Sequence, residues 1–212
     1  ILNKYSLLKD QNVPRETLLE FESFVDMLIR KNDQINIISK ETAKNDVIRN
    51  RHILDSAQII DFIDFNSKNI IDIGSGGGMP GIIVSIMIKN MERNLKVILY
   101  EKSHHKCAFL KKASKDLKLN TVVIKKNIFE EENLDTGTIM TRAFKPLPIV
   151  LDLVFKNFKN YKNLIIFMGK SGEKVLEETL NSWEFDFEKK QSITNEDSFL
   201  LNIKNIKKKI KN

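Results

Sequence analysis

Residues 69–81, which read NIIDIGSGGGMPG, constrain the fold of this chain more than any other stretch. A short apolar run ends at Asp72, and five glycines follow within the eight residues 74–81. The run is too short for a helix and fits a buried strand of a parallel sheet. Glycines permit positive φ and let main chain approach a ligand closely, and Pro80 suits the first turn of a following helix. The stretch therefore predicts a strand, a glycine-rich turn and a helix start, with a pocket for a small polar ligand at the turn.

Beyond this stretch, strand-like and helical segments alternate, which is typical of βαβ units and a mostly parallel sheet. We expect Ser103 to cap one of the helices. The last two strand-like segments have no helix between them, so they predict an antiparallel C-terminal hairpin. The expected strands are 69–73, 96–100, 121–125, 137–141, 163–168, 184–192 and 198–205, and the expected helices are 80–91, 103–117, a segment after 146 with Ile149, Val150, Leu153 and Val154 on its apolar side, and 173–180.

The first 67 residues carry helical signals and no strand signals. An entry at Pro14 precedes apolar residues at helical spacing, which predicts a helix ending near Asn32. A second helical stretch is expected over 42–64. We therefore divide the chain into an N-terminal helical region, 1–67, packed on an α/β domain, 68–212, with both forming one compact unit. The apolar positions of the first helix are Leu18, Phe21, Val25 and Leu28.

Two ligand fingerprints overlap in the glycine stretch. Residues 76–81 satisfy GxGxxG, the dinucleotide pattern of NAD-dependent oxidoreductases, and Glu101 follows at the distance of a ribose-binding acid. The first glycine of that pattern should come directly after the strand, however, and Gly74 and Ser75 intervene. Residues 72–78 satisfy DxGxGxG, the pattern of class I S-adenosylmethionine-dependent methyltransferases, which also have a terminal antiparallel hairpin. The second interpretation fits better, and the oxidoreductase remains the alternative.

The chemistry of S-adenosylmethionine agrees with the residue types. Its sulfonium is cationic and it has no pyrophosphate, so the carboxylate of Asp72 favours it and disfavours phosphates. Glu101 can accept both ribose hydroxyls, and a helix cap or a surface acid is the less favoured alternative. Asn127 and Ile128 follow the third strand, where an amide and an aliphatic side chain would hold adenine.

Four segments resemble one family, the RsmG (GidB) methyltransferases, which methylate N7 of one guanine, at position 527, in 16S ribosomal RNA. The resemblance extends over nearly the whole chain. The chain departs from the family at Ile128 and Phe129, where an acidic pair is common. It also has Gly169-Lys170 where the family often has Lys-Gly, so the resemblance assigns no role to Lys170. The four segments are 36–39 (NIIS), 51–56 (RHILDS), 71–82 (IDIGSGGGMPGI) and 141–144 (TRAF).

The resemblance implies S-adenosyl-L-methionine as cofactor, a Rossmann-like class I methyltransferase fold, and contacts from the glycine loop, the 127–129 segment and Arg142. Together with the fingerprint residues, the expected cofactor site is Asp72, Gly74, Gly76, Gly78, Met79, Glu101, Asn127, Ile128, Phe129 and Arg142. No metal site is expected.

Guanine N7 has a free lone pair at neutral pH, so the reaction needs positioning and no general base. Arg142 would donate to the base, and Phe144 would stack on it or lie in the core beneath the loop. Arg51, His52, Asp55 and Pro80 complete the expected substrate pocket. The alternatives are a surface ion pair between Arg51 and Asp55 and a core role for His52.

The composition suits a nucleic-acid partner without requiring one. The net charge is +7 and the pI about 9.3, and 42% of residues are hydrophobic. As partner we expect 16S RNA in the small ribosomal subunit or in an assembly intermediate. We also expect a monomer, no membrane contact and a cytoplasmic location. The lone Cys107 excludes an internal disulfide, and the start without Met suggests a trimmed chain. A non-catalytic RNA-binding protein of the same fold is a further alternative. Lys111, Lys112, Lys115 and the lysine-rich tail from Lys204 are phosphate contacts or a solvated face.

Overall fold

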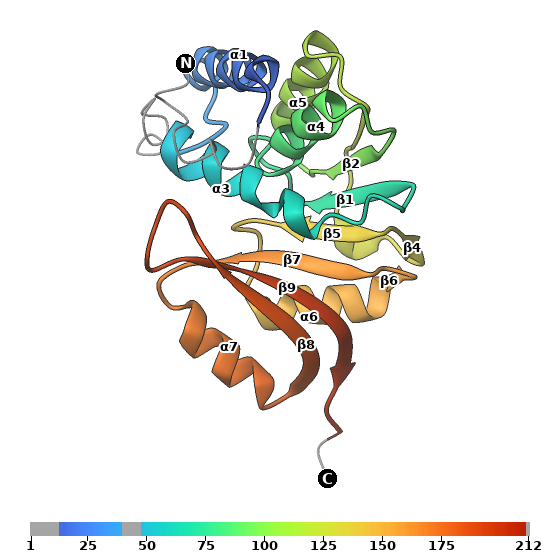
Figure 1. Cartoon of the computed structure of the whole chain (residues 1–212). Coiled ribbons are helices and arrows are strands. Elements are labelled where there is room, and N and C mark those ends of the chain that lie inside the picture. The colour runs from blue at the N-terminus through green and yellow to red at the C-terminus, as the bar shows by residue number, and fades with distance from the viewer. Residues whose placement is uncertain (1–12, 40–47, 211–212) are drawn as a thin grey trace.

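The computed structural model describes residues 13–39 and 48–210, except for the side chains of Asn50 and Arg51, and contains a seven-stranded sheet (Figure 1). The sheet order is β3-β2-β1-β5-β7-β9-β8. Strands β3 to β7 in this order are parallel, whereas β9 pairs antiparallel with β7 and with β8. The strands are β1 (Asn69–Ile73), β2 (Lys96–Tyr100), β3 (Thr121–Ile124), β5 (Thr138–Thr141), β7 (Asn163–Met168), β8 (Trp183–Gln191) and β9 (Phe199–Lys208).

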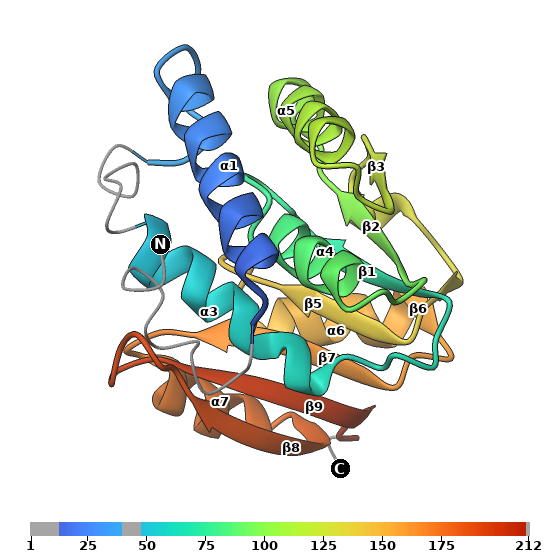
Figure 2. The ribbon, with the colours of Figure 1, turned by 45° about the horizontal axis from the view of Figure 1, so that its top comes forward.

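Helices cover both faces of this sheet (Figures 1 and 2). Apolar side chains of β1 alternate between the two: Ile70 joins the core under α1, α4 and α5, while Ile71 and Ile73 join the core under α6 and α7. Burial on both faces explains why the parallel strands are continuous apolar runs. The helices are α1 (Arg15–Asn32), α4 (Gly81–Asn90), α5 (His104–Asp116), α6 (Leu147–Asn157) and α7 (Gly172–Leu180).

The N-terminal region shares its core with the sheet domain. Phe21, Val25 and Leu28 of α1 are fully buried in the cluster that also contains residues of α4 and α5. The second helical stretch is described from residue 48 and changes type along its length, from a π-helical segment (Ile48–Ile53) through α3 (Leu54–Ala57) to a 3-10 segment (Gln58–Phe62). Residues 42–47 of the expected helix lie outside the described residues.

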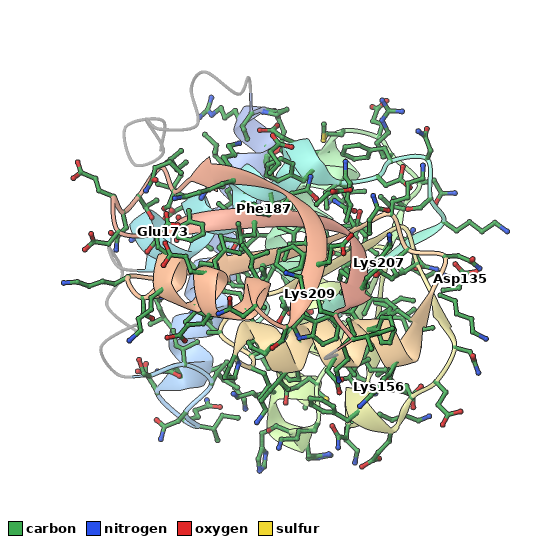
Figure 3. The ribbon with its side chains drawn as sticks, turned by 90° about the horizontal axis from the view of Figure 1, so that it is seen from below. Asp135, Lys156, Glu173, Phe187, Lys207 and Lys209 are labelled. Carbon is green, nitrogen blue, oxygen red and sulfur yellow. The ribbon has the colours of Figure 1, made fainter. Side chains whose placement is uncertain are left out.

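Most expected elements begin and end within a few residues of the observed ones, and three details differ. Ser103 makes no side-chain cap; its N–H instead donates to Glu101 Oε1 at 2.8 Å. Ile149 is 43% exposed rather than on the apolar face of α6. The lysines expected in a tail belong largely to β9, whose end lies among exposed side chains including Lys207 (Figure 3).

Two short elements have no counterpart in the prediction. A separate two-stranded parallel pair joins β4 (Leu134–Asp135) to β6 (Phe158–Lys159), and a 3-10 turn spans Ile128–Glu130. Among the described residues, no helix combines the length and the apolar character that a bilayer crossing requires.

The shared core predicts that loss of one α1 side chain destabilises the protein. Leu28→Ala should lower the free energy of unfolding by about 2 to 5 kcal/mol, because Leu28 is fully buried. Leu19→Ala is the matched control on the same helix, since Leu19 is 43% exposed. Urea denaturation checks both, and equal midpoints for the two variants would contradict the shared core.

Candidate functional site

A cleft of about 540 Å³ lies at the carboxyl edge of the parallel strands. In the sheet, β1 has β2 on one side and β5 on the other, so the strand order changes direction at β1. The cleft lies at this point, where α/β sheets commonly bind ligands. The volume is within the range of small-molecule sites. Its lining is Ile38, Ser39, His52, Gly74, Ser75, Gly76, Gly77, Met79, Tyr100, Glu101, Lys102, Lys106, Lys126, Asn127, Ile128, Arg142, Ala143, Phe144 and Lys145.

The glycine loop forms one wall of this cleft. Gly74 has φ +69°, and a Cβ there would collide with the ring of Phe144, so both conformation and space require glycine. Gly78 has φ +92° and lies away from the cleft, packed against Ile82 and Phe24. Gly74, Gly76 and Met79 therefore reach the cleft as expected, whereas Gly78 shapes the turn beneath it.

Asp72 lies behind the loop and does not line the cleft. Its side chain is fully buried, and its Oδ2 accepts a hydrogen bond from the N–H of Gly81 at 3.1 Å, at the start of α4. Burial raises the pKa of Asp72 to about 7, and the nearby charge of Glu101 adds to the increase. Asp72 was expected among the cofactor contacts; in the structure its carboxylate lies behind the loop and connects it to the helix that follows.

Glu101 lines the cleft and connects two of its walls. Its Oε2 accepts from the N–H of Gly76 at 2.9 Å and its Oε1 accepts from the N–H of Ser103 at 2.8 Å. The residue is 8% exposed. A carboxylate oxygen can accept a second hydrogen bond, so these contacts orient Glu101 and leave it able to accept from a ligand.

The segment after β3 forms the opposite wall. Asn127 and Ile128 line the cleft, and Asn127 Oδ1 accepts from the N–H of Phe129 at 3.4 Å, which caps the short 3-10 turn. Phe129 does not line the cleft, but its ring stacks on Phe144 with centroids 5.9 Å apart and planes 22° apart. The two rings form an aromatic pair at the rim.

Arg142, at the end of β5, joins the cleft to the helical region. Its Nη2 lies 3.4 Å from Asp55 Oδ2, its Nη1 donates to the carbonyl of His52 at 3.1 Å, and its guanidinium lies 5.2 Å from the ring centroid of Phe167. The RHILDS and RAF segments, separated by about ninety residues, are thus in contact as the pocket interpretation requires. Asp55 itself does not line the cleft but supports Arg142 from behind.

The other two expected substrate residues with described side chains have different positions relative to the cleft. His52 lines the cleft, whereas Pro80 lies outside the lining, at the start of α4. The side chain of Arg51 lies outside the described residues. Among the described residues, no group of His, Cys, Asp and Glu could hold a metal ion.

The chain matches one family over most of its length. The family model described as GidB, rRNA small subunit methyltransferase G, matches residues 17–201. A Pelagibacter ubique protein named Ribosomal RNA small subunit methyltransferase G is 73% identical over 209 residues, covering 99% of this chain and 98% of the relative. A Rickettsia felis protein of the same name is 35% identical, covering 92% and 97%. The chain belongs to this family.

The fold of this GidB family member agrees with solved methyltransferases. A structure described as a SAM dependent methyltransferase from Aquifex aeolicus superposes with a TM-score of 0.54 at 14% identity, covering 71% of this chain and 89% of that one. The resemblance and the class I methyltransferase fold inferred from the glycine stretch are therefore confirmed. Family membership also decides between the two fingerprints, and the oxidoreductase alternative is wrong.

Sequence reasoning missed two groups of residues at the site. Lys102, Lys106, Lys126 and Lys145 line the cleft and make it strongly basic. Ser192 and Thr194, in the turn between β8 and β9, each donate to Asp55 Oδ1 at 2.7 Å. A lysine directly after Glu101, the acid expected to bind ribose, was a usable signal for Lys102, whereas nothing local in the sequence connects the hairpin turn to Asp55.

The raised pKa of Asp72 predicts a pH-dependent stability. Between its ordinary pKa of 3.8 and about 7 the folded protein binds a proton that the unfolded chain releases, so this contribution to stability falls as pH rises through that window. Asp72→Asn removes the titrating group. Relative to wild type, it should gain roughly 2 kcal/mol of unfolding free energy between pH 5 and pH 8.

Urea denaturation of both proteins at the two pH values measures this difference. The exposed Asp186→Asn serves as control and should run parallel to wild type. A constant difference between wild type and Asp72→Asn would show that Asp72 does not titrate in this range.

The contacts of Asp55 predict a large effect of its removal. Asp55→Ala leaves the guanidinium of Arg142, whose side chain is 12% exposed, without its carboxylate, and should cost about 3 kcal/mol of unfolding free energy. Asp55→Asn keeps an acceptor for Ser192 and Thr194 and should cost less. Thermal unfolding ranks the variants, and an alanine variant as stable as the asparagine variant would contradict the role of these contacts.

Proposed function

We propose that this protein transfers a methyl group from S-adenosyl-L-methionine to N7 of one guanine, at position 527, of 16S ribosomal RNA. Family membership carries the proposal, because the relatives that cover nearly the whole chain are named Ribosomal RNA small subunit methyltransferase G. The cleft supports it, since the glycine loop, Glu101 and Arg142 meet at the carboxyl edge of the sheet.

The residues of the cleft fit the parts of S-adenosylmethionine. Glu101 offers a carboxylate to the ribose hydroxyls, Asn127 an amide to the adenine edge, and Ile128 an apolar surface to its ring. Within the described part of the chain, a Cβ at Gly76 would meet only the carbonyl oxygen of Gly74, so main chain is accessible there. When bound, S-adenosylmethionine supplies an electrophilic methyl group on its sulfonium.

The protein's task is then to place guanine, because N7 needs no deprotonation. Arg142 lines the cleft and carries several N–H donors, of which one directed at guanine O6 would orient the base. Phe144, stacked on Phe129, provides an aromatic platform for a base that has left its helix. Correct placement of reactants is worth up to ~7 to 11 kcal/mol in ideal cases.

The most informative experiment maps modified guanines in 16S ribosomal RNA by mass spectrometry. RNA from cells with this protein should contain one N7-methylguanine that is absent when the gene is removed. Purified protein and S-adenosylmethionine should restore it on small subunits or assembly intermediates isolated from those cells. An intact modification in cells lacking the protein would refute the proposed substrate.

The Arg142→Ala variant tests the positioning step. Loss of a charged donor should lower kcat/KM by about ten- to a hundred-fold, because a hydrogen bond to a charged group is worth about 1.5 to 3 kcal/mol. Arg93→Ala, which removes a cation over the ring of Phe65, is the control and should retain activity.

Titration with S-adenosylhomocysteine and thermal unfolding should accompany these assays, because Arg142 also pairs with Asp55. Near-normal turnover by a folded Arg142→Ala variant would remove Arg142 from the site.

A further inference from the structure

The positive charge of this protein is concentrated in one short segment. Residues 102–126 contain eight lysines and a single acid, Asp116, which is a net charge of +7. The whole chain also has a net charge of +7, so the remaining residues hold 27 basic and 27 acidic side chains. The high pI is therefore a local property and not a general one.

This segment forms α5, the turn after it and the edge strand β3 (Figure 2). The inner side of α5 is buried through Cys107, Leu110 and Ala113, so its lysines project from the other side. Lys111 and Lys115 are four residues apart and exposed, and thus lie on one stripe of the helix. We call four exposed lysines of this segment that do not line the cleft, Lys111, Lys112, Lys115 and Lys125, the α5 face.

The same segment also contributes to the cleft. Lys102 and Lys106, at the start of the same segment, and Lys126, at its end, line the cleft beside Glu101. A helix of 13 residues is about 20 Å long, so α5 as a whole extends well beyond a single nucleotide. A polyanion whose one base occupies the cleft would therefore have its neighbouring phosphates beside the α5 face.

Most of these charges are not neutralised by the fold. Lys112 pairs with Asp116 at 2.8 Å, and Lys126 with Glu131 at 2.7 Å. Within the part of the chain that the structure describes, the other six lysines of the segment form no ion pair with an acidic side chain. Clustered charge of one sign without internal partners is the electrostatic footprint of a nucleic-acid-binding surface.

The lysines at the end of β9 differ from those of the α5 face in their ion pairing and in their distance from the cleft. Lys208 contacts Asp152 at 3.3 Å and lies over the ring of Trp183, and Lys207 lies 4.0 Å from Glu184. Since β9 runs antiparallel to β7, its end lies at the edge of the sheet opposite to the cleft (Figure 3 labels Lys207 and Lys209). In the sheet order, β1, β5 and β7 also separate β9 from β2 and β3, so these lysines are remote from the segment that contributes Lys102, Lys106 and Lys126 to the cleft.

We propose that the α5 face binds the sugar-phosphate backbone of the RNA that flanks the guanine in the cleft. The inference rests on the proposed function and adds the surface on which the substrate lies. The contacts are with phosphates, so they supply affinity and position rather than base recognition.

The test compares Lys111→Ala/Lys115→Ala with Lys207→Ala/Lys209→Ala, which removes the same charge from the opposite edge. Methyl transfer to small subunits is measured at several KCl concentrations, with S-adenosylhomocysteine affinity and thermal unfolding as further readouts. The first variant should raise the KM for RNA about tenfold and reduce the slope of log affinity against log salt by about 1.5 to 2, with kcat, cofactor affinity and unfolding temperature unchanged. The second should match wild type.

Equal KM and equal salt slope for wild type and Lys111→Ala/Lys115→Ala would overturn the proposal, as would equal effects of the two double variants. RNA binding measured by fluorescence anisotropy separates this inference from the proposed function. If wild type transfers no methyl group to 16S RNA, the proposed function fails, whereas the comparison of the two variants in RNA binding still decides whether the α5 face binds the backbone.

Discussion

The arrangement of the site depends on one buried carboxylate, that of Asp55. Its Oδ2 faces Arg142 at the end of β5, and its Oδ1 accepts from Gln58 in the helical region and from Ser192 and Thr194 in the hairpin turn. A buried charge destabilises the fold unless it is paired and hydrogen-bonded. The partners of Asp55 come from three parts of the chain: the helical region, the end of β5 and the hairpin turn. The helical region, the parallel sheet and the C-terminal hairpin therefore meet at a single side chain behind the cleft.

A second carboxylate, that of Glu101, organises the glycine-loop side of the cleft in a similar way. Glu101 holds the N–H groups of Gly76 and Ser103, so the glycine loop and the start of α5 have fixed positions relative to each other. Asp72 fixes the other end of the loop to α4 through Gly81. The proposed methyl transfer relies on positioning, and such rigidity suits it because misplacement of a reactant lowers the rate directly.

The sequence predicted the sheet better than the side-chain environments. Strands such as Asn69–Ile73 and Asn163–Met168 were found with their observed bounds, because a strand buried on both faces must be an apolar run bounded by polar or glycine residues. The two-residue strands β4 and β6 are too short to leave a periodic signal. The burial of Asp72 and the pairing of Asp55 with Arg142 are tertiary properties, and neither residue spacing nor composition indicates which acid faces the ligand and which supports the loop.

The central claim is that the cleft beside Glu101 binds S-adenosylmethionine or its product, and isothermal titration tests it most directly. Wild-type protein should bind S-adenosylhomocysteine at one site, and Glu101→Gln should bind it more weakly, because an amide offers only one acceptor oxygen where the ribose hydroxyls and two main-chain N–H groups need two. NADH should not bind. Binding of NADH without binding of S-adenosylhomocysteine, or equal affinity of wild type and Glu101→Gln, would contradict the account.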